Sequence, residues 1–226
     1  MRPRLGRKVN RSFRPRLGCG ALLLSASTWT PVAAADDVHD AQYQPPPPQR
    51  RADFTVGLST AVGLSAASGF PNEGDKIDNP QFEQSTGANL GTGGALWLGG
   101  ALRDWFVIGF GLSKVSGQSG NKQLTSTSFI THLELYPLFS QGGTFRDLAV
   151  FADFGAGGAR IVSNDQNIAN GGIVSSLGGG IVFEPLRWGG FAAGPSVQYL
   201  HQYSPSLQAH FVGAGFRIAF YANGGR

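Results

Sequence analysis

Apolar residues alternate one by one with small or polar residues through most of the chain after residue 51. The alternation is clearest in residues 207–221, LQAHFVGAGFRIAFY, where one parity is large and apolar and the other is mostly glycine and alanine with Arg217. Because successive side chains of a strand point to opposite faces, this pattern predicts a two-faced β-strand. Small residues on the second face indicate a crowded interior, so we expect the apolar face to point toward lipid.

Seven further segments alternate in the same way, and stretches rich in glycine, proline, asparagine and charge separate them. In chain order, the expected strands are residues 52–64, 87–102, 105–114, 124–136, 147–158, 172–184, 190–201 and 207–221. Pro195 removes one donor from the ladder of the seventh strand, which predicts a local bulge. An even number of such strands predicts an all-β fold, an eight-stranded antiparallel up-and-down transmembrane barrel.

The lengths of the connections suggest which way the barrel points. We expect the first and third connections, residues 65–86 and 115–123, to be the longest loops, and connections two, four and six to be mostly tighter turns. Short periplasmic turns and longer outer loops are typical of outer-membrane barrels, which places both termini in the periplasm. Aromatic residues that gather near that rim predict a belt at the lipid–water boundary. They are Phe54, Trp105, Phe106, Tyr136, Phe183, Trp188, Phe220 and Tyr221.

The N-terminal region differs from the rest in charge. Seven of the 18 lysines and arginines lie in residues 1–35, which hold no acid, and an apolar run and small residues follow them. This order predicts a cleaved export signal. The rest of the chain contains the other 11 basic residues and all 14 acidic residues, so its net charge is negative. It has no basic patch that would indicate nucleic-acid binding. Cys19 is the one cysteine, and it lies inside the signal, so we expect no disulfide in the mature chain.

Composition divides the rest of the chain into three parts. Residues 36–51 are polar and contain four consecutive prolines, which predicts a proline-rich periplasmic tether outside any core. Residues 52–222 form the expected barrel, and residues 223–226 form a short C-terminal tail.

Charged residues fall on the inward parity of several strands: Asp53, Glu134, Asp153, Glu184 and Arg217. Charges inside a narrow barrel need partners. We therefore expect a polar cluster of Asp53, Glu134, Asp153 and Arg217, centred on Arg217, with Asp53 as its neighbour on the adjoining first strand. A barrel of eight strands is only wide enough to be filled by its own side chains, which favours a plug over an ion path through this cluster.

Two other groups of residues are candidates for function. Ser204 and Ser206 lie close in sequence to His201 and His210, the residue types of a lipid hydrolase, although a polar loop has the same composition. The first loop contains Phe70, Ile77 and Phe82 among charged residues, and it is the candidate external binding surface if it is more than a solvated loop. The histidines do not have the spacing of a metal site, and no motif indicates a cofactor.

Three segments carry a resemblance to a known class. They are Glu134-Leu135-Tyr136-Pro137-Leu138, the run FADFGAGGA in the fifth strand, and Gly215 to Phe220 with its glycine, alternating large apolar residues and final aromatic. Across residues 52–222 the chain resembles the eight-stranded outer-membrane barrels of Gram-negative bacteria, of the OmpA, OmpX and OmpW kind. Six residues follow Phe220, whereas those families usually end on the aromatic residue.

The resemblance implies a location and a set of partners. It implies export through the inner membrane, insertion by the barrel-assembly machinery, and contact with outer-membrane lipid. The role that we expect is structural, anchoring or surface interaction, without catalysis. A small pore, a barrel-type lipid hydrolase and a soluble lipocalin-like binder remain the alternatives, since one fold serves many functions.

Overall fold

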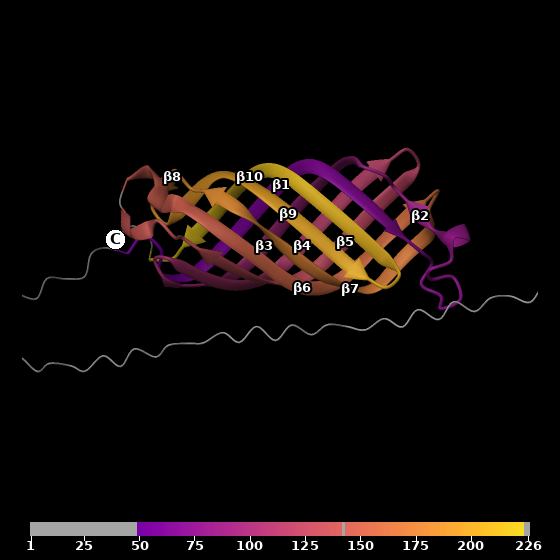
Figure 1. Ribbon diagram of the computed structural model, residues 1–226. Helices are drawn as coiled ribbons and strands as arrows, with labels where there is room; N and C mark the ends of the chain where they lie inside the picture. Colours follow the sequence, from indigo (N-terminus) through magenta and orange to yellow (C-terminus); the bar gives the residue numbers. More distant parts are fainter. Residues whose placement is uncertain (1–48, 142, 224–226) are drawn as a thin grey trace, which may run out of the picture. The chain divides into compact units, whose positions relative to one another are not determined.

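A computed structural model describes residues 49–141 and 143–223 of the chain (Figure 1). The predicted export signal with Cys19, most of the predicted tether and most of the predicted C-terminal tail lie outside these residues. The long strands are β1 (Asp53–Gly69), β3 (Asn89–Arg103), β4 (Phe106–Ser119), β5 (Lys122–Leu135), β6 (Leu148–Ser163), β7 (Gln166–Phe183), β9 (Phe191–Ser204) and β10 (Leu207–Tyr221). The shorter elements are β2 (Gln84–Ser85), β8 (Leu186–Trp188) and the 3₁₀ turns η1 (Pro80–Phe82), η2 (Phe139–Gln141) and η3 (Thr144–Asp147). No helix among the described residues has the length and apolar character needed to cross a membrane.

The eight long strands close on themselves. Each long strand pairs antiparallel with its neighbour in chain order, and β10 pairs with β1 from Tyr221↔Thr55 to Leu207↔Gly69. This last ladder removes the free edges of the sheet. The expected fold class, a closed eight-stranded antiparallel up-and-down barrel, is confirmed.

The outward parity of the strands is the apolar one, as expected. Phe216 and Ile218 are 43% and 40% exposed, whereas Arg217 between them is 2% exposed. Exposed large apolar side chains occupy outward positions all round the barrel, among them Phe54, Leu98, Phe110, Phe129, Phe154 and Ile181. A lipocalin-like soluble barrel would have the opposite arrangement, with apolar residues inside and charges outside.

Several of the connections differ from the expectation, most clearly the third, the fourth and the fifth. We use "terminal end" for the rim where β1 begins and β10 ends, and "loop end" for the opposite rim (Figure 1). The third connection is a two-residue turn at Gly120-Asn121 rather than a long loop, and the strands on either side take up most of residues 115–123. The fourth connection, residues 136–147, is long and contains η2 and η3. Long connections therefore occur at both ends of the barrel, and their lengths do not define its orientation.

The expected loop at the third connection was wrong because the strand ends at the loop end are polar on both faces and do not alternate. At the fifth connection, Asn164 and Asp165 have φ values of 48° and 62°, the left-handed conformation that both central residues of a type I′ hairpin turn require. Asparagine and aspartate tolerate this conformation better than most residues. A tight hairpin and a polar loop thus have the same composition here.

Pro195 lies in β9 without a register shift against β10, where it pairs with Phe216. On its other side, pairing with β7 ends at Ser196, and β8 pairs from Ala193 onward. The missing N–H of Pro195 therefore falls in the gap between two partners of β9. The predicted bulge was wrong for this reason.

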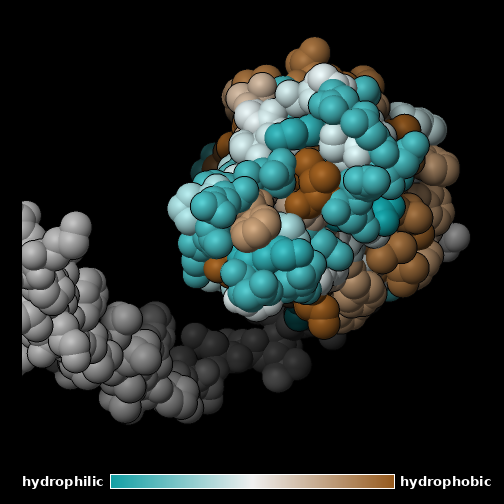
Figure 2. Space-filling view, turned by 90° about the vertical axis from the view of Figure 1, so that its right-hand side faces the viewer, coloured by the Kyte–Doolittle hydropathy of each residue, from teal (hydrophilic) through white to brown (hydrophobic). Residues whose placement is uncertain are grey.

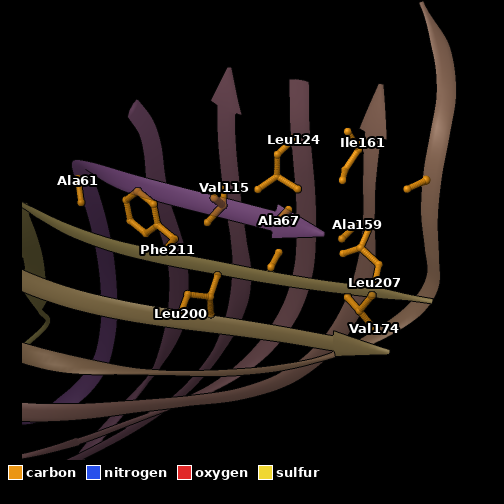
Figure 3. Close-up of a cluster of buried hydrophobic side chains, with 12 residues drawn as sticks. Ala61, Ala67, Val115, Leu124, Ala159, Ile161, Val174, Leu200, Leu207 and Phe211 are labelled. Atoms are coloured by element: carbon orange, nitrogen blue, oxygen red, sulfur yellow. The ribbon is translucent and has the colours of Figure 1, made fainter. Parts of the chain in front are cut away.

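The interior of the barrel is packed with side chains. Toward the loop end, Phe211, Leu124, Ile161, Leu200 and Leu207 belong to an apolar cluster (Figure 3). A second cluster, toward the terminal end, combines small apolar residues with four buried aromatic rings, those of Trp97, Phe151, Tyr136 and Tyr221. Tyr136 and Tyr221 share the inward parity of Glu134 and Arg217, so they face the interior and not the predicted lipid boundary.

Seen from the loop end, the barrel is mostly hydrophilic, with a hydrophobic group near the centre of the mouth (Figure 2). Hydrophobic residues lie along the visible side of the wall. The first connection lies at this end and is held against the barrel: the Phe70 N–H donates to the Ser206 carbonyl at 2.7 Å, and the Asn170 N–H donates to the Phe70 carbonyl at 3.1 Å.

Candidate functional site

A cluster of buried ionic groups crosses the interior near the terminal end. Arg217 on β10 places its guanidinium 2.5 Å from the Glu134 carboxylate on β5. These two strands lie four positions apart in an eight-strand ring, so the ion pair reaches across the lumen. Both side chains are almost fully buried, which makes each the obligatory partner of the other.

His132 extends this pair to a second carboxylate. It lies two residues before Glu134 on the same face of β5, and its Nε2 contacts the Glu134 carboxylate. Its Nδ1 lies 2.5 Å from Asp153, which is the residue opposite it on β6. Arg217, Glu134, His132 and Asp153 thus form one continuous chain of contacts.

Two tyrosines and a further carboxylate close the cluster toward the rim. The Tyr136 hydroxyl donates to Glu134 at 3.0 Å, and it lies 2.9 Å from the Tyr221 hydroxyl. Tyr221 donates to Glu184 at 3.2 Å, and Arg217 lies 3.4 Å from the same carboxylate. Each hydroxyl donates to one buried carboxylate, and Arg217, which contacts both, offsets the repulsion between them.

Arg51 covers this layer from the terminal end. Its guanidinium lies 2.7 Å from Asp147 and 3.6 Å from Glu184, and it stacks over the Tyr136 ring at 3.4 Å. Arg187 pairs with the same two carboxylates at 3.2 and 3.3 Å. Arg51 is 1% exposed, so the expectation that the tether up to residue 51 lies outside any core was wrong at its last residue.

Burial acts differently on the groups at this rim. Burial opposes the charge on Arg51, but Tyr136, Tyr221, Glu184 and Asp147 outweigh it and raise the pKa of Arg51 above its usual value. Burial raises the pKa of the Tyr136 hydroxyl well above its ordinary value, and the charges of Glu134 and Glu184 add to the effect. Arg51 therefore stays a cation and Tyr136 stays a hydrogen-bond donor throughout the physiological range.

Trp97 covers the cluster from the interior side. Its ring stacks on His132 with 4.5 Å between centroids, and the Arg217 guanidinium lies 5.0 Å from the Trp97 ring. Below this level an interior cavity of about 20 Å³ lies beside Asp153 and Phe151. That space holds about one water molecule, so it is no channel.

The structure brings together three of the four predicted cluster residues, Glu134, Asp153 and Arg217. Asp53 is not among them: it is exposed at the terminal rim, where it contacts Asn223. The β1–β10 register explains the error, because it places Ser59 opposite Arg217. Asp53 lies six residues away from Ser59, which is about 20 Å along a strand.

Several members of the cluster were missed at the level of the sequence. Trp97, His132 and Tyr221 all lie on the inward parity of their strands, so parity was the available signal for them. Arg51 lies outside the strands, where alternation gives no signal, and Asp147 opened the expected strand 147–158 but lies in η3 in the structure. Their pairing depends on how the connections fold over the rim.

The serines and histidines of the hydrolase alternative lie on different sides of the wall. Ser204 and Ser206 are buried at the end of the lumen, where Ser206 donates to the Asn170 carbonyl at 2.8 Å. His201 and His210 lie opposite each other on the outward face, and their rings stack with 4.5 Å between centroids. The wall of the barrel therefore separates the nucleophile from the base that it would need.

The predicted external binding residues do not form one patch of equal exposure. Phe82 is exposed in η1, and the ammonium of Lys76 lies 5.7 Å from its ring. Phe70 and Ile77 are half-buried. Phe70 serves mainly to fix the loop to the mouth through its backbone.

No family model and no curated protein matches the chain. Solved structures with a similar fold include the attachment invasion locus protein Ail of Yersinia pestis (13% identity, 71% of this chain and 97% of that one, TM-score 0.40) and Neisserial surface protein A (9% identity, 73% and 96%, TM-score 0.44). The outer membrane protein OprG of Pseudomonas aeruginosa is also similar (13% identity, 77% and 99%, TM-score 0.33). The outer membrane enzyme PagL is similar at 14% identity (70% and 97%, TM-score 0.32). The chain shares with them a closed, eight-stranded antiparallel barrel. Likeness at this level concerns the fold and assigns no activity.

Proposed function

We propose that this protein is an outer-membrane barrel with a structural, anchoring or surface-interaction role and without catalysis. One observation carries the proposal: a closed barrel exposes large apolar side chains all round its wall while its charges are buried and paired inside. Exposing that apolar surface to water would be unfavourable, and exposing it to acyl chains is not. The apolar segment Gly215 to Phe220 is the signal that we propose for the barrel-assembly machinery.

The lumen supports a closed plug rather than a pore. The ionic cluster spans the terminal half, and toward the loop end the lumen is packed by the apolar cluster around Phe211 and Leu124 together with buried polar side chains such as Gln202 and Ser128. An ion that crossed the barrel would have to break the Arg217–Glu134 pair and then pass the packed side chains around Phe211 and Leu124. This packing supports a barrel that is closed to ions.

Surface interaction is assigned to the loop end. The first connection is fixed at Phe70 and Thr86, whose hydroxyl accepts from the Ala67 N–H at 3.0 Å. Between these anchors it presents Phe82 and several charged side chains away from the barrel. A fixed loop with an exposed aromatic residue suits recognition at low entropic cost.

Three measurements test the proposal. In cells, the protein should sediment with the outer-membrane fraction of a sucrose gradient, and its band should shift on boiling before electrophoresis, as a closed barrel does. The purified barrel in a planar bilayer should show no regular conductance steps. Recovery in the soluble fraction would contradict the membrane role, and steady unitary steps would contradict the plug.

A further inference from the structure

The outward face of the barrel wall carries very few charges. Between the two rims, the outward positions of the eight long strands in the described residues hold two formal charges, Lys114 on β4 and Arg160 on β6. No acidic side chain occupies an outward position there. Both cations are exposed, and neither forms an ion pair with another described residue.

Both cations lie where the wall changes from apolar to polar. On β4 the outward series runs Phe110, Leu112, Lys114, Ser116, so the lysine follows directly on the last large apolar residue. On β6, Arg160 comes two outward positions after Ala156. Only β5 separates β4 from β6, so the cations lie on one stretch of the wall rather than at two unrelated sites. Strand spacing places them roughly 12 Å apart.

A groove in the apolar wall ends at Lys114. It has a volume of about 750 Å³ and runs over the outward faces of β10, β1, β3 and β4. Small outward residues form its floor because Gly94 pairs with Thr60 on one side and with Lys114 on the other. Leu58, Leu96 and Leu112 line it with apolar side chains, and Ala214 extends it onto β10.

Polar groups surround the lysine at the end of the groove. Thr127 lies opposite Lys114 on β5, and Ser116 lies two residues further along β4. A second groove of about 330 Å³ begins at Thr127 and continues past Thr125 to Arg160. An apolar groove thus leads into a polar, cationic region.

We propose that this wall binds one membrane lipid with a phosphate-bearing headgroup. An acyl chain fills the groove over Gly94, Thr60 and Ala214, while the phosphate pairs with the Lys114 ammonium. Thr127 and Ser116 supply hydroxyl donors. An ammonium at the edge of hydrocarbon is costly without a counter-ion, and the outward wall provides none, so the lipid supplies the missing anion. Arg160 lies within reach of a larger headgroup.

The proposal rests on the membrane position argued above. It predicts a one-to-one complex between the folded barrel and dioctanoyl phosphatidic acid, detected by native mass spectrometry from detergent. Dioctanoyl phosphatidylcholine, whose phosphate is already paired with its own choline, should bind much more weakly. Lys114→Gln should weaken phosphatidic acid binding about tenfold, the value of one charge-assisted contact.

A second variant tests the groove itself. Ala214→Phe places a ring in the groove on an already apolar, outward position, so the barrel should still fold and lose the lipid. Arg103→Gln, at the opposite rim, and Ala152→Phe, outward on β6, are the matched controls and should bind normally. A boiling-dependent gel shift of each variant shows that the barrel is intact before its lipid binding is measured.

Three results would overturn the lipid site. One is equal binding of the phosphatidic acid and phosphatidylcholine probes. Another is phosphatidic acid binding that neither Lys114→Gln nor Ala214→Phe changes. The third is full competition by glycerol 3-phosphate at the lipid's own concentration, which would mean that the groove contributes nothing. Each leaves the barrel and its fractionation unaffected, so failure here is distinct from failure of the membrane role.

Discussion

At the residue scale, the Arg217–Glu134 pair decides how the barrel interior is held. Neither partner has access to water, so removal of one leaves a buried charge without compensation. His132 and Glu184 contact the same groups, which spreads the effect over the whole cluster. Loss of the pair would therefore also disturb the contacts that His132 and Glu184 make with these two side chains.

We expect Glu134→Gln to lower the free energy of unfolding by about 3–5 kcal/mol, since Arg217 then stays buried and partly unpaired. Arg217→Met alone should cost a similar amount. The double variant should be less destabilised than the sum of the two, which urea titration of the folded barrel in micelles measures by tryptophan fluorescence. Lys76→Gln in the exposed first loop is the control. Additive losses would show that the two side chains do not interact.

Also at the residue scale, Gly57 leaves the space that Trp97 occupies. A Cβ built on Gly57 would lie 2.2 Å from two atoms of the Trp97 ring. The ring is held by its stack on His132, so it has little freedom to move away. Inward glycine is thus a packing requirement of this narrow barrel.

Gly57→Ala should therefore destabilise the barrel by about 1–3 kcal/mol, the usual effect of overpacking. Gly74→Ala, where nothing lies within 4 Å of the added Cβ, should change stability very little. Thermal melting in micelles compares the two variants. Equal melting temperatures for both would contradict the packing of Trp97 against Gly57.

At the scale of elements, the sequence predicted the strands well and the connections poorly. Alternation identifies a strand wherever one face is apolar, as in β10, because each side chain's environment is local to its own strand. It fails at the loop end, where β4 and β5 are polar on both faces and look like a loop. The same limit applies to the ionic cluster. The parity of β5 predicts that Glu134 points inward, but only the register between β1 and β10 shows that Asp53 lies far from Arg217.

The β6–β7 turn offers a test of this interpretation. Asn164 and Asp165 both have positive φ, which costs free energy for Asp165 but not for glycine. Asp165→Gly should stabilise the barrel by about 0.5–1 kcal/mol, whereas Asp165→Val should destabilise it by at least that amount. Differential unfolding in urea gives both signs, with Asp165→Asn as the control that keeps a tolerant residue. Stabilisation by valine would show that these residues form a loop and not a tight hairpin.

At the scale of the whole molecule, the account depends on the direction in which the apolar parity points. A closed barrel with Phe216 and Ile218 outside and Arg217 inside is suited to acyl chains around it and a filled lumen within it. The ionic cluster, the apolar cluster and the proposed lipid groove all follow from that orientation. If the wall faced water, the physical argument for each of these three features would fail.

The most direct measurement is the accessibility of a spin label on the outward wall, in the folded barrel reconstituted in lipid bilayers from a chain without Cys19. A label at Ile218→Cys should collide more with oxygen, which concentrates in hydrocarbon, than with a water-soluble nickel complex. A label at Gly74→Cys, in the exposed first loop, should show the reverse preference. A label at position 218 that met the nickel complex as readily as the loop label does would contradict the outward, lipid-facing wall.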